Sequence, residues 1–281
     1  MTRHASTNLD GRFSMIAVLL ICTLCIRLSA SETQASRYLT GVRNSPDLPL
    51  NPKQLSSLLE SLRRKSGFQD MHFDQFGFLQ LGDRANIAGG SAAARKLLIA
   101  AVDRAKAIDL ENHNRTSQIA FARLAMAVTY ISRQTGAHIE VSPIQIDFSD
   151  FAHLRGDQKA IEAFDIGYVV LHELGHAALG LRDALINGQE PGECEEYVNQ
   201  IRRDLGVPER QHYVAHTQLR RVFSSQPPSH QAELLFATST DDKTKLQPLS
   251  LRWDASQVGM IRLGDLKPPS ISQRPQSTLA P

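Results

Sequence analysis

The chain has few cysteines and no excess of charge of either sign. It contains 281 residues but only three cysteines, too few for a disulfide-stapled scaffold. Its 31 basic and 29 acidic residues leave a formal net charge of +2, which gives no reason to expect a nucleic-acid partner. With 42% hydrophobic and 21% charged residues, the composition is typical of a globular protein with one large domain or two small ones.

An uncharged apolar run near the N-terminus is too short to cross a bilayer comfortably. It covers residues 15–26, follows a basic segment and precedes small residues, an order that predicts a signal peptide over residues 1–30. We therefore expect a secreted or periplasmic protein with no membrane contact after cleavage. The alternative is a chain anchored in the membrane by an uncleaved signal segment. Cleavage would remove Cys22 and Cys25 and leave Cys194 as the single thiol.

Polar segments at both ends limit the expected domain. Residues 31–51 are predicted to be a linker or a short pro-segment. Residues 254–281, which end in a proline-rich stretch, are predicted to be a flexible tail. The folded domain is expected over residues 52–253, with its core at 68–222.

The spacing of apolar residues predicts an α+β domain, mostly helical with a small sheet. Apolar residues three and four positions apart predict helices over 52–65, 91–110, 119–133, 158–181 and 193–205, and a further helix over 210–224. Alternation and turn residues predict an extended segment over 73–81, a strand over 138–148 and a hairpin over 233–253. Because Pro143 cannot donate a ladder hydrogen bond, strand 138–148 is expected at a sheet edge or bent at that residue.

One short motif indicates chemistry. The segment 167–181 reads GYVVLHELGHAALGL and contains His172, Glu173 and His176. On a helix, positions i and i+4 lie about 40° apart, so both imidazoles project from one face and form half of a zinc site. Glu173, about 100° round from His172, can act as a general base without being a ligand. The pattern predicts a Zn²⁺ site that retains an open coordination position for hydrolysis.

The apolar surroundings of the motif raise its significance. Apolar residues flank it on every side, so the helix is expected to be buried. Two histidines and a glutamate are costly in a buried helix unless they are paired or bound to a metal. The alternative interpretation is a pair of core histidines with Glu173 as their hydrogen-bond partner.

The HELGH segment resembles the zincin superfamily of metallopeptidases, whose shared motif is HExxH. The run at 193–205 is also weakly similar to the downstream segment of bacterial effector-type metallopeptidases. The resemblance implies a zinc-dependent metallopeptidase, an endopeptidase rather than an exopeptidase, with His172 and His176 as ligands and Glu173 as general base. It further implies a zincin-like domain whose edge strand flanks the HExxH helix and binds a peptide or protein substrate in extended form, a role that suits residues 144–148.

Three residues are candidates for the third zinc ligand, and Glu196 is preferred for its spacing, with Glu195 as the alternative. In the gluzincin branch it is a glutamate of the next helix, and Glu196 lies 20 residues after the second histidine. Amphipathicity favours Glu195 instead, because Glu195 flanks the apolar face of that helix while Glu196 points nearly opposite. The metzincin pattern would place the ligand at Arg182, which cannot bind a metal. Asp183, one residue late for that pattern, is the third candidate.

Other residues and other functions remain as alternatives. Secondary candidates for the cleft, each more simply explained by packing or a surface position, are His153, His212, His216, Tyr197 and Tyr213. Cys194 is expected to be a buried packing thiol. The alternatives to a general peptidase are a secreted zinc-binding or scaffold protein without catalysis, and a protease effector or toxin that is specific for one protein.

Overall fold

The computed structural model describes residues 40–116, 118–131, 138–184, 191–212, 216–220, 229–239 and 246–259. The predicted signal peptide, most of the predicted tail and Tyr213 lie outside these residues. Within the described ranges, no helix is both long and apolar enough to cross a membrane. Twelve strands and five α-helices share this part of the chain. The α+β class agrees with the prediction, but the domain is not mostly helical.

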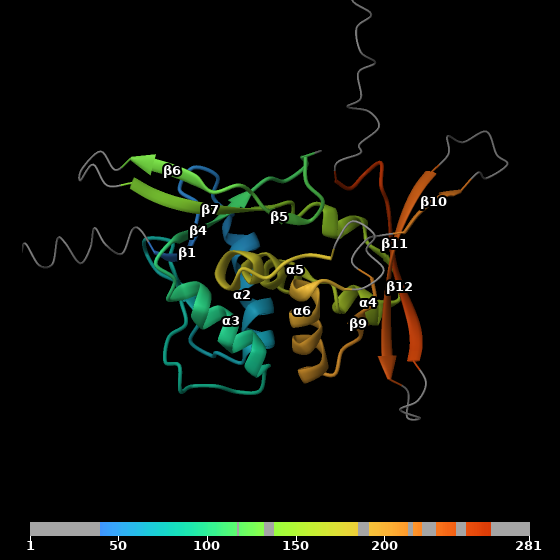
Figure 1. The fold of residues 1–281 in the computed structure, drawn as a ribbon, viewed down its shortest axis with the longest axis horizontal. Coiled ribbons are helices and arrows are strands. Elements are labelled where there is room, and N and C mark those ends of the chain that lie inside the picture. The colour runs from blue at the N-terminus through green and yellow to red at the C-terminus, as the bar shows by residue number, and fades with distance from the viewer. Residues whose placement is uncertain are drawn as a thin grey trace, which may run out of the picture.

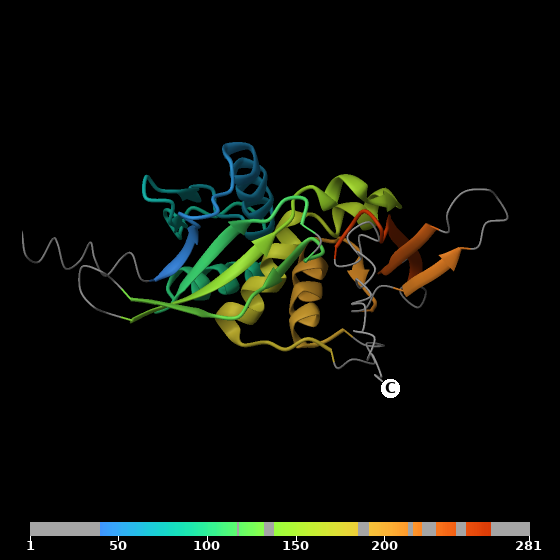
Figure 2. The ribbon, with the colours of Figure 1, turned by 90° about the horizontal axis from the view of Figure 1, so that it is seen from above.

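The first sheet forms one side of the main core. It consists of β1 (Gly41–Asn44), β4 (Ala107–Asn112), β7 (His138–Ile146), β5 (Ala122–Leu124) and β6 (Val128–Ile131). The strands β1, β4 and β7 are parallel, whereas β5 and β6 run antiparallel, one after the other, along the remaining side of β7. Figures 1 and 2 show this sheet lying across the helices.

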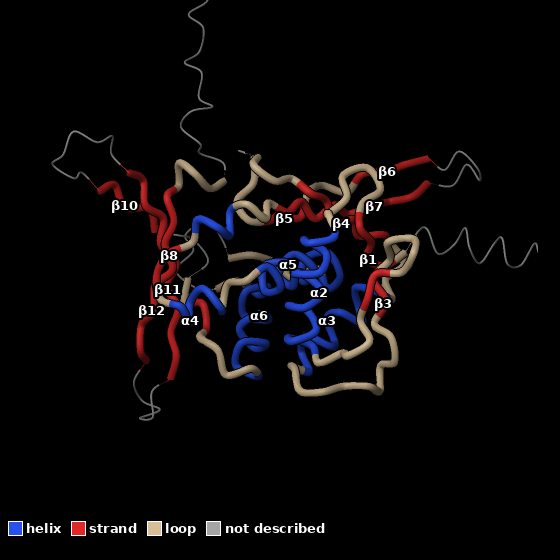
Figure 3. Tube along the Cα trace, turned by 180° about the vertical axis from the view of Figure 1, so that it is seen from behind, coloured by secondary structure: helices blue, strands red, loops and turns tan. Residues whose placement is uncertain are grey.

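Four helices pack beneath the first sheet (Figures 1 and 3). They are α2 (Pro52–Ser66), α3 (Ala92–Val102), α5 (Ile166–Leu174) and α6 (Glu193–Asp204). Local sequence sets the ends of α2: Asn51 and Gln54 form a capping box, and Gly67 ends the helix in the left-handed conformation. The core between layers includes Leu58, Leu62, Leu97, Leu98, Ile108, Leu110, Ile144, Ile146, Val170 and Leu171, all almost fully buried.

A second sheet packs beside this body through an aromatic cluster. Its strands are β8 (Arg155–Gly156), β9 (Glu209–Arg210), β10 (His216–Arg220), β11 (Ser229–Ser239) and β12 (Leu246–Asp254). Phe121 makes edge-to-face contacts with Phe164 and Trp253, with ring centroids 5.0 and 5.2 Å apart. Short elements complete the fold: β2 (His72–Phe73), β3 (Leu79–Gln80), η1 (Asp150–His153), α4 (Gln158–Glu162) and the π-helical turn η2 (Gly175–Leu179).

Several predicted elements are confirmed and others are wrong. The helices predicted over 52–65 and 193–205, the helix pair within 158–181 and the hairpin over 233–253 are present as α2, α6, α4 with α5, and β11 with β12. The helix predicted over 91–110 ends at Val102 and is followed by β4. The helix predicted over 119–133 is replaced by β5 and β6, the segment 210–224 contains β10, and the predicted linker contains β1.

The physical reason for these errors is strand pairing. Residues 107–112 lie between β1 and β7, with Ile108 and Leu110 buried, and residues 122–131 lie along β7. Pairing partners that are distant in sequence override weak helical spacing in such short apolar runs.

Strand β7 lies inside the sheet rather than at its edge, and Pro143 explains an irregularity beside it. The Pro143 carbonyl accepts a hydrogen bond from the Ala125 N–H, at 2.8 Å, but proline has no N–H to return the second bond of that pair. Leu124 and Val128 are four residues apart, whereas their partners Ile144 and Val141 are three apart. The edge is therefore formed by β5, a β-bulge and β6, and not by residues 144–148.

Candidate metal centre

The helix that carries the motif is anchored at its first turn. The Asp165 carboxylate accepts hydrogen bonds from the N–H groups of Gly167 and Tyr168, which caps α5. The same carboxylate accepts from Ser61 Oγ at 2.8 Å and from Lys65 Nζ at 2.7 Å, both on α2. Every residue of α5 is buried, as its apolar flanks predict. The position of the motif is therefore fixed by the main core.

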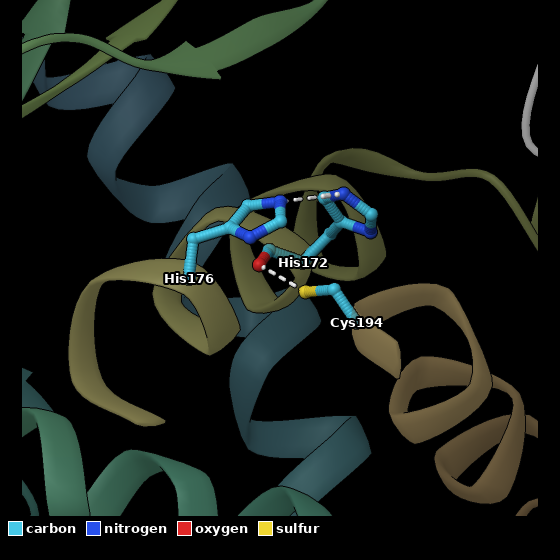
Figure 4. Close-up of side chains that lie close together, drawn as sticks. All are labelled: His172, His176 and Cys194. Atoms are coloured by element: carbon cyan, nitrogen blue, oxygen red, sulfur yellow. Dashed lines mark hydrogen bonds between the residues drawn. The ribbon is translucent and has the colours of Figure 1, made fainter. Parts of the chain in front are cut away.

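The two imidazoles project from one face of the helix and point toward each other (Figure 4). The distance between His172 Nε2 and His176 Nε2 is 3.1 Å. His176 Nδ1 lies 2.7 Å from the Leu181 carbonyl oxygen, and His172 Nδ1 lies 3.3 Å from Glu195 Oε2. If each Nδ1 carries the proton toward its oxygen, both Nε2 atoms present lone pairs to the same point. In that tautomer the two acceptor atoms, 3.1 Å apart, are placed to bind one cation between them.

Asp183 completes a triangle of donor atoms. Its Oδ1 lies 3.1 Å from His172 Nε2 and 3.1 Å from His176 Nε2. In a tetrahedral zinc site with bonds of 2.0–2.1 Å, neighbouring ligand atoms lie about 3.3–3.4 Å apart. The three atoms are thus close to the separations that a zinc ion requires, so the residues present fit the ion.

The backbone after the second histidine brings Asp183 to this place. The π-helical turn η2 holds one more residue than an α-helical turn, and it covers Gly175–Leu179. Gly180 then adopts the left-handed conformation, with φ of +68°, and ends the helix. Asp183 therefore follows the two histidines through a π-helical turn and a left-handed glycine, and not along a regular helix.

The two glutamates of α6 have different surroundings. Glu195 is buried, with 1% of its side chain exposed, and pairs with Arg202 Nη1 at 2.5 Å and Arg210 Nη1 at 2.9 Å. It faces Nδ1 of His172, which is the nitrogen that does not point toward Asp183. Glu196 is exposed and pairs with Arg203 at 2.6 Å. The structure does not bring Glu196, the preferred third ligand, into the cluster, because burial of the apolar face of α6 turns that side chain outward.

Glu173 lies in the gap between α5 and the edge strand. Its Oε2 accepts a hydrogen bond from the Leu124 N–H of β5, at 2.6 Å. Burial raises the pKa of Glu173, and the nearby imidazoles of His172 and His176 oppose that rise. A carboxyl group with a raised pKa next to a pair of histidines suits a general base.

The surroundings of the histidines favour positive charge. Burial acts to lower the pKa of both imidazoles, but the acceptor groups around them outweigh it. Asp183, Cys194 and Glu195 raise the pKa of His172 well above its ordinary value. Asp183, Cys194 and the Leu181 carbonyl raise the pKa of His176 to about 10. A site that stabilises a proton on each ring provides the negative potential that a divalent cation requires.

Cys194 is the site residue that sequence reasoning missed. Its Sγ donates a hydrogen bond to the His172 carbonyl at 2.9 Å and lies, with one ligand atom of each histidine, in a group whose members are all within 4.8 Å. The nearby imidazoles His172 and His176 lower the pKa of the thiol against the effect of burial. The sequence offered one signal for this role, since Cys194 directly precedes Glu195, which lies on the inner face of α6. A single cysteine outside a recognised motif does not by itself indicate a metal ligand.

The secondary candidates do not join this group. The Tyr197 hydroxyl donates to the Ala93 carbonyl at 3.0 Å, so it is occupied by a contact with α3. His153 lies in η1 and His212 follows β9, so neither is on α5 or α6, which carry His172 and Cys194.

The arrangement as a whole could hold one cation on His172, His176 and either Asp183 or Cys194, with Glu173 beside it. Comparisons of the sequence with models of known families, with curated proteins and with solved structures yield no match. The geometry and the donor atoms of this centre are therefore the features of the chain that indicate its function.

Proposed function

We propose that the chain is an exported zinc-dependent metallopeptidase of the zincin type. The observation that carries the proposal is the triangle of His172 Nε2, His176 Nε2 and Asp183 Oδ1, with sides of 3.1 Å, beside the buried Glu173. Two imidazoles and one carboxylate form a donor set that suits zinc and leaves a fourth position open. Asp183 replaces Glu196 as the proposed third ligand.

The proposed mechanism assigns a role to each polar side chain. His172, His176 and Asp183 would hold the zinc ion, which would supply Lewis-acid chemistry for the scissile carbonyl and for the attacking water. Glu173 accepts the proton of the attacking water and transfers it to the leaving amine. Glu195 orients the His172 ring through Nδ1 and makes it a better ligand, while Arg202 balances the buried charge.

The substrate is proposed to bind as an extended strand along β5. The Leu124 N–H points away from β7 and toward Glu173, so a peptide added to that edge would pass beside the candidate metal centre. In the resemblance to zincins this role belongs to the edge strand, which is β5 and not the segment 144–148.

Zinc content per chain tests the site. We expect one zinc in the purified wild type, and loss of zinc in His172→Ala and Asp183→Ala. Glu195→Ala should weaken zinc affinity about 10- to 100-fold, as removal of an orienting carboxylate does. Glu196→Ala is the matched control on the same helix and should keep zinc. A wild type that binds no zinc when it is supplied would contradict the proposal.

The variant Glu173→Gln tests the chemistry separately from the site. It should bind zinc like the wild type, because Glu173 is not a ligand, and it should lower the rate of peptide hydrolysis about 10²- to 10⁴-fold. Hydrolysis at the wild-type rate by a zinc-loaded Glu173→Gln variant would exclude the general-base role.

One observation favours a second candidate, a non-catalytic zinc-binding protein. Cys194 Sγ lies in the same group as the two histidines. Zinc bound to both histidines, Asp183 and this thiolate would have a complete tetrahedral shell, as structural sites have. Loss of zinc in Cys194→Ala would support this reading, whereas a zinc-loaded and active Cys194→Ala supports the peptidase.

A further inference from the structure

The edge of the first sheet continues beyond the candidate metal centre as an uncharged arm. Residues 125–131 read AMAVTYI, and residues 126–131 are exposed. Ile131 is 64% exposed and Met126 is 90% exposed. Among the described strands, β6 pairs only with β7. Figures 1 and 2 show β6 and the adjoining part of β7 extending past the helices.

Sheet edges of this kind are ordinarily protected. Edge strands carry charged side chains, a proline or a covering element that prevents pairing with another chain. Residues 125–131 contain no charged residue and no proline, and their β-branched and aromatic side chains favour an extended strand. The backbone of the arm therefore offers a template for strand addition.

The register shows which backbone groups point outward. The Pro143 carbonyl faces the antiparallel neighbour of β7, so Val141 and Ile139, which alternate with it, face the same way. Their partners Val128 and Tyr130 are thus the inward-bonded residues of β6. The N–H and C=O groups of Thr129 and Ile131 point away from the sheet, in line with the outward group of Leu124 on β5.

We propose that this arm binds an apolar, extended segment of the polypeptide substrate, as a continuation of the strand bound along β5. The proposal rests on the proposed function for the place of cleavage. Antiparallel addition is the more stable arrangement per residue. Counting along the regular strand β7, Glu140 and His138, the partners of Thr129 and Ile131, stand four and six residues from Ile144, the partner of Leu124. The apolar substrate side chains that pack beside Thr129 and Ile131 should thus lie four and six positions N-terminal to the residue beside Leu124.

Binding can be measured without cleavage in the Glu173→Gln background. The probes are two fluorescent ten-residue peptides that differ at those two positions, with valine in one and aspartate in the other. Fluorescence polarisation should show about tenfold tighter binding of the valine peptide. Ile131→Lys should lower its affinity about tenfold. Leu246→Lys is the matched control, since Leu246 is 61% exposed on β12 and outside the arm.

A backbone variant separates strand addition from simple apolar contact. Thr129→Pro removes one outward N–H and leaves the pairing of β6 with β7 intact, so it should weaken the valine peptide about as much as Ile131→Lys does. Equal binding of the two peptides, or unchanged binding by Ile131→Lys and Thr129→Pro, would overturn the proposal.

Two further outcomes distinguish the occupant and the function. A wild-type dimer in sedimentation that Ile131→Lys converts to a monomer would mean that a second copy covers the arm, which overturns the proposal. If the variants change binding as expected while the wild type cleaves neither peptide, the arm is a peptide site and the peptidase function fails.

Discussion

Gly167 of α5 lies directly against Ser61 of α2, and its replacement by alanine gives a quantitative test of the packing. A Cβ atom there would lie 2.2 Å from Ser61 Oγ and 2.9 Å from Ser61 Cβ. Ser61 is not free to move, because its hydroxyl donates to Asp165 and accepts from Lys65. The substitution should therefore strain the contact that positions the helix of the candidate metal centre.

The two opposing contributions can be estimated. Alanine is more stable than glycine in a helix by about 1 kcal/mol. Overpacking a filled core costs about 1–3 kcal/mol, and disturbing buried hydrogen bonds costs about 1–3 kcal/mol more. We expect Gly167→Ala to lower the free energy of unfolding by about 1–5 kcal/mol. In a Ser61→Gly background both short contacts are absent, so Gly167→Ala should raise it by up to about 1 kcal/mol.

Urea unfolding of the wild type, both single variants and the double variant measures this change of sign. The coupling energy between the two positions should be about 2–6 kcal/mol, which is well above the error of such a cycle. If Gly167→Ala stabilises both backgrounds by the same amount, the contact does not exist and the placement of α2 on α5 is wrong.

Two further predictions concern buried charges. Burial lowers the pKa of Lys65 from 10.5 to about 8, against the opposing effect of Asp165, so the unfolded chain binds more protons than the folded chain between these values. The free energy of unfolding of the wild type, minus that of Lys65→Met, should therefore rise between pH 8 and 10.5 by up to about 1.4 kcal/mol per pH unit. If this difference between the two proteins stays constant over that range, the prediction is refuted. Arg202→Met removes a buried partner of Glu195 and should cost about 3–5 kcal/mol in urea unfolding, with part of the loss recovered by Glu195→Gln; no recovery would show that Arg202 acts through other contacts.

Local patterns were sufficient for the parts of the fold that depend on near neighbours. The i, i+4 spacing of His172 and His176 places both rings on one face of any helix, and the structure has them on one face. Helix α2 follows from apolar periodicity with capping residues at its ends, and helix α6 follows from apolar periodicity before Gly206. The β11–β12 hairpin follows from two alternating runs around a polar turn.

Long-range pairing decided the rest of the sheet. Residues 107–112 and 122–131 have apolar spacing compatible with a helix, but β1 and β7 provide partners that bury them as strands. The prediction that Pro143 places its own strand at a sheet edge was wrong, because β7 lies between β4 and the pair β5 and β6. The effect of Pro143 is a bulge in the neighbouring strand, because the missing N–H interrupts one pair of hydrogen bonds and not the strand itself.

By itself, the sequence determined the helix that carries the motif, its burial and the residues on its inner face, because helical geometry relates residues only a few positions apart. The third donor atom was decided by the tertiary structure. Whether Asp183, Glu195 or Glu196 approaches the histidines depends on the π-helical turn after His176 and on which face of α6 is buried. Both are consequences of packing between segments that no local spacing specifies.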